Sequence, residues 1–298
     1  MRPIVGLDWG TSSLRAALFD AQGRVTQERS LPRGILTVPP GGFPAVFNDA
    51  CGDWMRGGKA LALVAGMAGS RQGWVEAPYC ACPAGFGDIA ARLAWAEPGR
   101  IAIVPGLSCE AEGVPDVMRG EETQVFGAMQ LLGLDSGLFV LPGTHSKWVR
   151  VAAGRIEGFE TFMTGEFYGL LRQHSILARS LPDGVGDTDA QAFERGVQHA
   201  IQVGNLLHAA FSARTLALFD RMPAAALPSY LSGLVIGEEL RSQHLGALSE
   251  PVTVIGSPAL APRYELALRA LGVPVQSAGS QATWRGLWAM ARTLEHLA

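Results

Sequence analysis

Two short polar turns in different parts of the chain carry the residues best suited to binding phosphate. The first turn is Gly10-Thr11-Ser12-Ser13, and it follows an apolar run that ends in Asp8. Successive backbone N–H groups in such a turn can form a nest for phosphate oxygens. A carboxylate at the strand end suits Mg²⁺, which keeps much of its water. An ordinary polar hairpin is the alternative reading of this segment alone.

The second turn repeats the same pattern of apolar run, Gly-Thr, polar residues and apolar run. Gly143-Thr144 is followed by His145, Ser146 and Lys147. Lys147 could reach a phosphate as a point charge, although it could equally be a solvated loop lysine. His145 is more simply a hydrogen-bonded structural residue. Two Gly-Thr hairpins indicate two elements that bind the β- and γ-phosphates of one nucleotide.

Phosphoryl transfer to a hydroxyl also needs a group that orients and deprotonates that hydroxyl. Arg119-Gly120-Glu121-Glu122 precedes the second turn, at the start of a predicted helix. The helix dipole favours carboxylates there in any case, so a purely structural role is the alternative. We expect Glu121 to be the base, because Gly120 lets the substrate approach the backbone. Glu122 lies about 100° further around the helix and suits a capping or pairing role.

The composition excludes several classes of protein. The 298 residues are 48% hydrophobic and 17% charged, which is typical of a well-packed globular protein. A net charge of -3 without a basic run argues against nucleic acid as a partner. No apolar stretch approaches the roughly 20 residues of a membrane span. The P-loop, Rossmann and protein-kinase signatures are missing.

Cysteine usage and the N-terminus indicate where the protein is found. Cys80 and Cys82 are spaced too closely for the usual redox or zinc patterns. The first residues enter a strand-like run at once and do not resemble a signal peptide. We therefore expect reduced thiols and a cytoplasmic protein. The sequence leaves open whether the chain forms a homodimer.

Apolar periodicity and turn residues predict the elements that position these side chains. An antiparallel meander over residues 4–7, 14–19 and 25–30 surrounds the first turn. Further strands are expected at 60–64, 101–104, 138–141, 148–151, 156–162 and 252–255. Helices are expected at 121–132, 165–177, 189–219, 227–240 and 283–297, and the helix at 189–219 is expected to break near Gly204. A further helix is expected to follow Gly256-Ser257-Pro258 and to end at Leu271. Residues 181–187 read as a mobile loop.

On these residues the chain resembles the sugar-kinase/hsp70/actin superfamily. The first turn, the second turn and the Gly256-Ser257 step before a helix are similar to its phosphate-1, phosphate-2 and adenosine elements. The resemblance implies an α/β fold with two ribonuclease-H-like (actin-like ATPase) domains flanking an interdomain cleft. It implies domains at 1–118 and 119–298, with the terminal helix free to pack back on the first.

Longer strings resemble one family within it over essentially the whole chain. Met-Arg-Gly-Glu-Glu-Thr-Gln at 118–124 and Pro-Gly-Thr-His-Ser-Lys-Trp at 142–148 are similar to the 2-dehydro-3-deoxygalactonokinases. Members use ATP and Mg²⁺ to phosphorylate the 6-hydroxyl of 2-dehydro-3-deoxy-D-galactonate, a sugar acid of galactonate catabolism. The chain departs from the wider sugar-kinase pattern in having Glu, not Asp, as the expected base.

The resemblance implies a role for each polar residue. Catalysis is expected from Glu121, Glu122 and Asp8, and Asp8 would also face the metal. The ATP site would comprise Asp8, Gly10, Thr11, Ser12, Ser13, Gly143, Thr144, Ser146, Lys147, Gly256 and Ser257. The substrate wall would comprise Met67, Ser70, Trp74 and Tyr79, with Arg15, Arg71, Arg119 or Lys147 binding the substrate carboxylate. Trp74 and Tyr79 could instead be core aromatics.

Three alternatives stay open from the sequence. The substrate could be the C4 epimer, 2-dehydro-3-deoxygluconate, or another sugar, because nothing in the sequence reads that stereocentre. The protein could also be a nucleotide-switched binding protein of the hsp70 or actin kind, which needs no hydroxyl-activating base. Gly233 and Gly237 resemble the close helix contact at an interdomain hinge, but plain helix packing explains them equally well.

Overall fold

The computed structural model describes residues 2–184, 187–247 and 250–297, and it has a mixed α/β fold with three sheets. The chain divides into two compact units. Unit 1 comprises Met1–Phe139, Val149–Glu160 and Ala278–Ala298, and unit 2 comprises Val140–Trp148 and Thr161–Ser277. Among the described residues, no helix has the length and apolar character needed to span a membrane.

The six-stranded sheet of unit 1 is built around the predicted meander. Strands β1 (Ile4–Trp9), β2 (Leu14–Phe19) and β3 (Val25–Leu31) pair antiparallel in sequence order, which confirms that prediction. The other strands are β4 (Leu61–Gly66), β6 (Ala94–Glu97) and β7 (Ile101–Ile103), and the sheet order is β3-β2-β1-β4-β7-β6. β4 pairs parallel to β1 and β7 and is buried along its whole length, as central parallel strands are.

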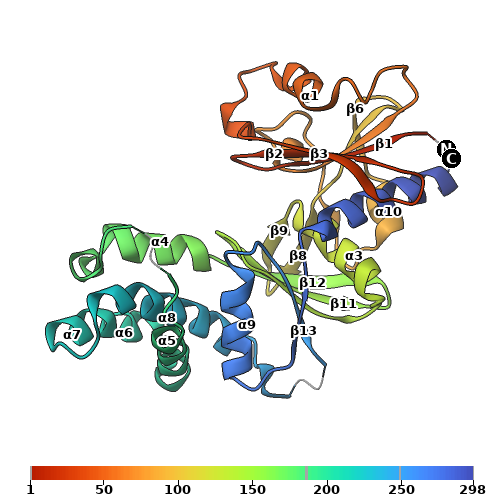
Figure 1. Cartoon of the computed structure of the whole chain (residues 1–298). Coiled ribbons are helices and arrows are strands. Elements are labelled where there is room, and N and C mark those ends of the chain that lie inside the picture. Colours follow the sequence, from red (N-terminus) through yellow and green to blue (C-terminus); the bar gives the residue numbers. More distant parts are fainter. Residues whose placement is uncertain (1, 185–186, 248–249, 298) are drawn as a thin grey trace. The chain divides into compact units, whose positions relative to one another are not determined.

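Helix α3 is fixed in unit 1 by glycine contacts with the terminal helix. α3 spans Glu121–Leu132, as predicted, and lies beside α10 (Gln281–Leu297) in Figure 1. A Cβ atom on Gly127 of α3 would lie 1.7 Å from the carbonyl oxygen of Ala282. A Cβ atom on Gly286 would lie 2.0 Å from the carbonyl oxygen of Thr123. The two helix backbones therefore touch directly, which sets the position of the first turn of α3.

Several smaller elements of unit 1 were not predicted. They include β6 and also α1 (Phe43–Cys51), α2 (Phe86–Ala90), β5 (Cys80–Ala81), β8 (Leu107–Ala111) and β9 (Val114–Met118). β5, β8 and β9 form a separate three-stranded sheet. β9 ends at Met118 and is followed directly by the Arg119–Glu122 segment. The end of this sheet therefore positions the predicted catalytic residues Glu121 and Glu122 at the start of α3.

The second large sheet repeats the strand order of the first five strands of the first sheet. Its order is β12-β11-β10-β13-β14, which corresponds to β3-β2-β1-β4-β7 in the first sheet. In both sheets, three consecutive strands lie side by side in reverse order, and two later strands follow. The strands are β10 (Gly137–Leu141), β11 (Ser146–Ala152), β12 (Arg155–Phe162), β13 (Val252–Ile255) and β14 (Val275–Ala278). The second Gly-Thr turn joins β10 to β11, just as the first joins β1 to β2.

Helices make up most of unit 2 (Figure 1). They are α4 (Thr164–His174), α5 (Ala190–Val203), α6 (Leu206–Ala209), α7 (Ser212–Leu218), α8 (Leu227–Ser242) and α9 (Ala261–Ala270). A Cβ atom on Gly233 would lie 2.0 Å from the carbonyl oxygen of Phe193, and one on Gly237 would lie 2.9 Å from Val197. These two glycines therefore allow α8 to pack closely on α5. This contact fits the second interpretation of Gly233 and Gly237, in which they serve helix packing and not a hinge.

The prediction of one long helix over 189–219 was wrong in its length. Asp189 caps α5 by accepting a hydrogen bond from the backbone N–H of Ala192 at 2.9 Å. The break near Gly204 is confirmed, since this residue has a φ of 63° and ends the helix in a left-handed conformation. Asn205 then caps α6, and a further break separates α6 from α7. Part of the predicted mobile loop 181–187 lies outside the described residues.

Candidate functional site

Asp8 is held at the end of β1 by an arginine directly across the sheet. Asp8 and Arg15 are register partners in β1 and β2, and Arg15 Nη2 donates a hydrogen bond to Asp8 Oδ2 at 2.6 Å. The Arg15 guanidinium also lies 5.2 Å from the ring of Trp284 in α10. Asp8 Oδ1 accepts no hydrogen bond from the described residues. Arg15 therefore orients Asp8, and this pairing competes with the predicted role of Arg15 in binding a substrate carboxylate.

The first turn packs against the segment at Gly34-Ile35, and its hydroxyl-bearing residues are exposed. The N–H of Gly10 donates to the Ser13 carbonyl at 2.9 Å, and the N–H of Ile35 donates to the Gly10 carbonyl at 3.0 Å. A Cβ atom on Gly34 would lie 2.2 Å from the carbonyl oxygen of Thr11, so the bracing segment touches the turn backbone. The exposed residues of the turn are Thr11, Ser12 and Ser13.

Two glycines bring the end of β4 against the start of α3. Gly66 has a φ of 90° and Gly120 a φ of 104°, both in the region that favours glycine. A Cβ atom on Gly120 would lie 3.2 Å from Gly66 Cα, and one on Gly66 would lie 3.5 Å from Asp8 Oδ1. The same edge of unit 1 therefore carries Asp8 and the Arg119–Glu122 segment, which are far apart in the sequence.

The adjacent carboxylates Glu121 and Glu122 have different environments. Glu122 is fully buried, and its Oε2 accepts a hydrogen bond from the N–H of Gly120 at 2.7 Å. Burial, followed by the nearby Glu121 carboxylate, raises the pKa of Glu122 to about 8. Glu121 is partly exposed, and its Oε2 accepts a hydrogen bond from the N–H of Arg119 at 2.9 Å. Of these two residues, Glu121 is therefore the one with surface exposure.

Arg119 has buried donors without a protein partner. Its Nη2 donates to the Ala77 carbonyl at 2.8 Å, and its guanidinium lies 4.5 Å from the ring centre of Tyr79. Nε and Nη1 are buried and donate to no described residue, and the buried Oγ of Ser70 is likewise unpaired. Unpaired buried polar groups are uncommon and costly, especially when charged. These donors suit an anion that the protein itself does not supply.

Three other residues predicted to bind substrate, Met67, Arg71 and Trp74, have other partners in the structure. Trp74 packs among the core aromatics, with ring centroids 6.1 Å from Trp9 and 5.4 Å from Phe47, which supports the core alternative. Met67 also packs against that core. Arg71 is largely exposed and pairs with Glu76 at 3.5 Å. Of the predicted wall, Tyr79 is the member that contacts Arg119, and Ser70 contributes a buried hydroxyl without a partner.

In unit 2, the first turn of α4 holds the second Gly-Thr turn. A Cβ atom on Gly165 would lie 2.4 Å from the Gly143 carbonyl oxygen, and the N–H of Glu166 donates to the Thr144 carbonyl at 3.0 Å. His145 Nε2 lies 2.6 Å from Glu166 Oε2, in keeping with a structural histidine. Gly165 is thus required for the helix start to approach the turn so closely.

Lys147 and Ser146 point inward at the start of β11. Lys147 is only 6% exposed, and its Nζ donates to Thr161 Oγ1 at 2.6 Å, so the solvated-lysine alternative is wrong. Ser146 is fully buried, and its Oγ donates to Thr164 Oγ1 at 3.3 Å. These side chains connect the turn to the elements beneath it.

A cavity of about 610 Å³ opens at the second turn and runs along α4 to the starts of α8 and α9. Its lining includes Gly143, Thr144, Tyr168, Arg172, Leu260 and Arg263. Arg172 Nη1 donates to the Tyr168 hydroxyl at 3.0 Å, and a Cβ atom on Gly256 would lie 3.4 Å from Pro142. The predicted adenosine residue Gly256 thus adjoins the turn, and Ser257 accepts hydrogen bonds at the start of α9. This volume suits a ligand of nucleotide size.

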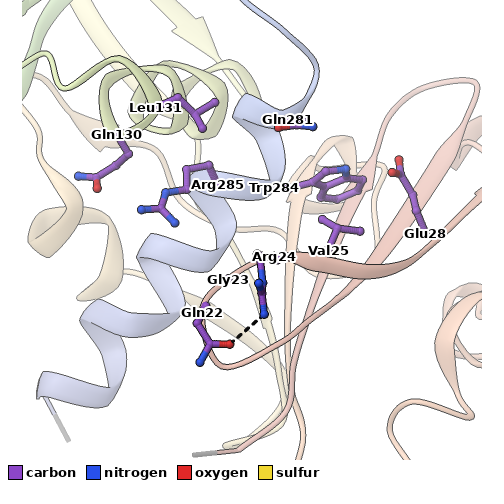
Figure 2. A pocket seen from close by; sticks show the side chains of 10 residues that line it. All are labelled: Gln22, Gly23, Arg24, Val25, Glu28, Gln130, Leu131, Gln281, Trp284 and Arg285. Atoms are coloured by element: carbon purple, nitrogen blue, oxygen red, sulfur yellow. Dashed lines mark hydrogen bonds between the residues drawn. The ribbon is translucent and has the colours of Figure 1, made fainter.

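Another cavity, of about 570 Å³, lies on unit 1 between the β2–β3 turn, the end of α3 and the first turns of α10. Figure 2 shows Arg24, Trp284 and Arg285 among its lining side chains. Arg24 is already paired with Asp20 at 2.7 Å. None of the residues predicted from the sequence to form the site lines this cavity.

The model of one known protein family matches most of the chain. The family model described as 2-keto-3-deoxy-galactonokinase matches residues 8–290. The chain belongs to this family. The match extends from the first turn to α10 and therefore includes both Gly-Thr turns, the Arg119–Glu122 segment and the cavity of unit 2.

Other members of the 2-keto-3-deoxy-galactonokinase family match over nearly their full length. A 2-dehydro-3-deoxygalactonokinase of Escherichia coli (strain K12) is 34% identical, covering 97% of this chain and 98% of its own. A crystal structure from Sinorhizobium meliloti, of a protein whose name as a 2-dehydro-3-deoxygalactonokinase is provisional, has a TM-score of 0.90 at 36% identity. It covers 98% of this chain and 99% of its own.

A more distant solved structure shares the fold of this family member. It is the activator of 2-hydroxyisocaproyl-CoA dehydratase from Clostridium difficile, with bound ADPNP. Its TM-score is 0.53 at 10% identity, covering 99% of this chain and 97% of its own. At this identity the similarity describes the fold alone.

A buried carboxylate in α8 was not predicted from the sequence. Glu239 is 2% exposed and accepts hydrogen bonds from Trp148 Nε1 and the Tyr264 hydroxyl, both at 2.7 Å, and from Thr164 Oγ1. Burial raises the pKa of Glu239, and the hydrogen bonds of its partners act in the opposite direction. The available signal was a Glu inside a largely apolar helix, which must find buried partners.

Replacing Glu122 should change how stability depends on pH. Its folded-state pKa of about 8 lies above the ordinary value of 4.5, so the folded protein binds this proton more tightly than the unfolded chain. This contribution to stability is therefore complete below about pH 4.5 and is lost as pH rises towards about 8. Relative to wild type, Glu122→Gln should become progressively more stable over that window. Denaturant titrations at several pH values would show this, and parallel pH profiles would contradict it.

Proposed function

We propose that this protein transfers a phosphoryl group from ATP to the 6-hydroxyl of 2-dehydro-3-deoxy-D-galactonate, in galactonate catabolism. The observation that carries the proposal is the pair of buried, unpaired donors on Arg119, two residues from the partly exposed Glu121. A sugar-acid kinase needs a cation for the substrate carboxylate and a base for its hydroxyl. The name of the E. coli relative supports the same activity.

The proposed ATP site uses the two Gly-Thr turns and the cavity of unit 2. Backbone N–H groups of the two turns, together with the exposed hydroxyls of Thr11, Ser12, Ser13 and Thr144, bind the phosphates. The adenosine enters the cavity lined by Tyr168, Leu260 and Arg263, next to Gly256. The repeated strand order of the two large sheets supports two ribonuclease-H-like domains of the actin-like ATPase kind, with bounds at 1–118 and 119–298.

Asp8 fits the proposed Mg²⁺. One of its oxygens is held by Arg15, which leaves Oδ1 for a water or an ion. No cluster of three or more His, Cys, Asp or Glu side chains that could hold a metal is found in the described part of the chain. Mg²⁺ commonly binds through one or two carboxylates, waters and substrate phosphates, so a lone carboxylate is sufficient. When bound there, Mg²⁺ would neutralise charge on the phosphates.

The remaining chemistry comes from the Arg119–Glu121 segment. Arg119 binds the substrate carboxylate through a donor that no described residue uses, on Nε or Nη1. This contact fixes the substrate so that its 6-hydroxyl meets Glu121. Glu121 orients that hydroxyl and accepts its proton as the phosphoryl group transfers. Because the transition state is loose, orientation contributes more than early deprotonation.

A coupled assay of ADP release tests this function directly. Purified protein with ATP and Mg²⁺ should release ADP with 2-dehydro-3-deoxy-D-galactonate well above the rate with water alone. The C4 epimer 2-dehydro-3-deoxygluconate and a neutral sugar should be poorer substrates. Steady ATP hydrolysis that no sugar acid accelerates would instead indicate a nucleotide-switched binding protein.

Removing the Arg119 guanidinium should weaken substrate binding selectively. A hydrogen bond to a charged group is worth about 1.5–3 kcal/mol, so Arg119→Met should raise the KM for the sugar acid about 10- to 100-fold. The KM for ATP should stay close to that of wild type. Arg56→Met is the matched control, because Arg56 is an exposed arginine of the same unit. Equal effects of the two substitutions would argue against the carboxylate role.

Replacing Glu121 and replacing Glu122 should have different effects on kcat. A positioned general base contributes about 10²–10⁴-fold in rate, so Glu121→Gln should lose a factor of that order in kcat while still binding ATP. Glu122→Gln should lose much less, because the buried Glu122 side chain caps the start of α3. If Glu122→Gln is the inactive variant, the assignment is reversed. If both keep nearly full activity, the base is elsewhere, and Glu166 is the next candidate.

A further inference from the structure

The carboxylate of Glu239 joins three separate elements of unit 2. Its Oε1 accepts a hydrogen bond from Trp148 Nε1 of β11 at 2.7 Å. Its Oε2 accepts one from the Tyr264 hydroxyl of α9 at 2.7 Å and another from Thr164 Oγ1 at the start of α4. Thr164 Oγ1 in turn accepts a hydrogen bond from Ser146 Oγ. A single side chain in α8 thus fixes β11, α4 and α9.

Helices α4 and α9 line the cavity that adjoins the second Gly-Thr turn, and β11 is joined to that turn. β11 begins directly after that turn, and Gly165, the neighbour of Thr164, touches the Gly143 carbonyl. Tyr264 follows Arg263, and both line a small hollow that shares Gly143 and Gly165 with the larger cavity. The hydrogen bonds of Glu239 therefore lie directly beneath the backbone that would bind phosphate.

Stability alone is a poor reason for a carboxylate at this position. Among the described residues, the partners of Glu239 are an indole N–H and hydroxyl groups, and none is a cation. Burying a charge without a cation is costly, and apolar replacements of buried charged groups are often neutral or stabilising. A fully hydrogen-bonded buried polar network instead gives a fixed geometry. What Glu239 contributes is the relative placement of three donors on three elements.

We propose that Glu239 is a positioning residue for nucleotide binding, and that it acts through Thr164 and Trp148 on the turn at residues 143–147. The inference rests on the proposed use of this turn and cavity for ATP. Without the carboxylate, the start of α4 and the start of β11 lose their common acceptor. The Gly143 and Thr144 backbone then no longer keeps the geometry that the phosphates require, whereas the surroundings of Arg119 in unit 1 are unaffected.

The test compares Glu239→Gln with Glu238→Gln, the same substitution one residue earlier in α8. Glu238 pairs with Arg241 at 2.6 Å and takes no part in the buried network. Binding of a non-hydrolysable ATP analogue is measured by calorimetry without sugar acid, and KM for the sugar acid and kcat are measured separately. Glu239→Gln should weaken analogue binding about tenfold or more and lower kcat, with the KM for the sugar acid within about twofold of wild type. Glu238→Gln should match wild type in all three.

Tyr264→Phe and Trp148→Phe each remove one hydrogen-bond donor to Glu239. If Glu239→Gln does not fold, analogue binding is measured with these two variants instead. Each should weaken analogue binding in the same direction, and Tyr264→Phe should add little when combined with Glu239→Gln, because both remove one shared network. Normal analogue binding by folded Glu239→Gln, or by both single-donor variants, would overturn the proposal. So would an equal loss of analogue and sugar-acid binding. Failure of the proposed function has a different signature, because wild type would then bind the analogue yet phosphorylate no sugar acid.

Discussion

The close approach of Gly66 and Gly120 is the constraint on which the site in unit 1 depends. Both residues have positive φ, and a Cβ atom on Gly120 would lie 3.2 Å from Gly66 Cα. Any larger side chain would strain the backbone and separate the end of β4 from the start of α3. Because β4 pairs with β1, this one contact places Asp8, Arg119 and Glu121 at the same edge of the sheet. The proposed chemistry needs all three there.

Burial assigns different roles to carboxylates that look alike in the sequence. Glu122 and Glu239 are buried, and their oxygens are used by a backbone N–H at the start of α3 or by side chains of other elements. Their pKa values are raised for the same reason. Glu121 is partly exposed and lies beside a cation with unpaired donors. The first two therefore stabilise local geometry, and Glu121 is the one able to meet a substrate hydroxyl.

Local patterns were sufficient to predict the strand–turn–strand units and helix α3, because alternation, turn residues and the Gly120 boundary act over short distances. From the sequence, Arg119 could not be ranked above Arg15 or Arg71, since its role depends on which donors are already paired in the fold. Glu239 was missed because its partners lie 25 to 91 residues away in the chain. The break between α6 and α7 carries no Gly or Pro, so propensity alone does not predict it.

A crystal structure of the protein with 2-dehydro-3-deoxy-D-galactonate bound would show which cation and which carboxylate of the protein contact this substrate. If the proposal is correct, the substrate carboxylate lies within hydrogen-bond distance of Nε or Nη1 of Arg119, and the 6-hydroxyl contacts the carboxylate of Glu121. A substrate carboxylate bound instead by Arg15, Arg71 or Lys147, with the Arg119 donors still unpaired, would contradict it.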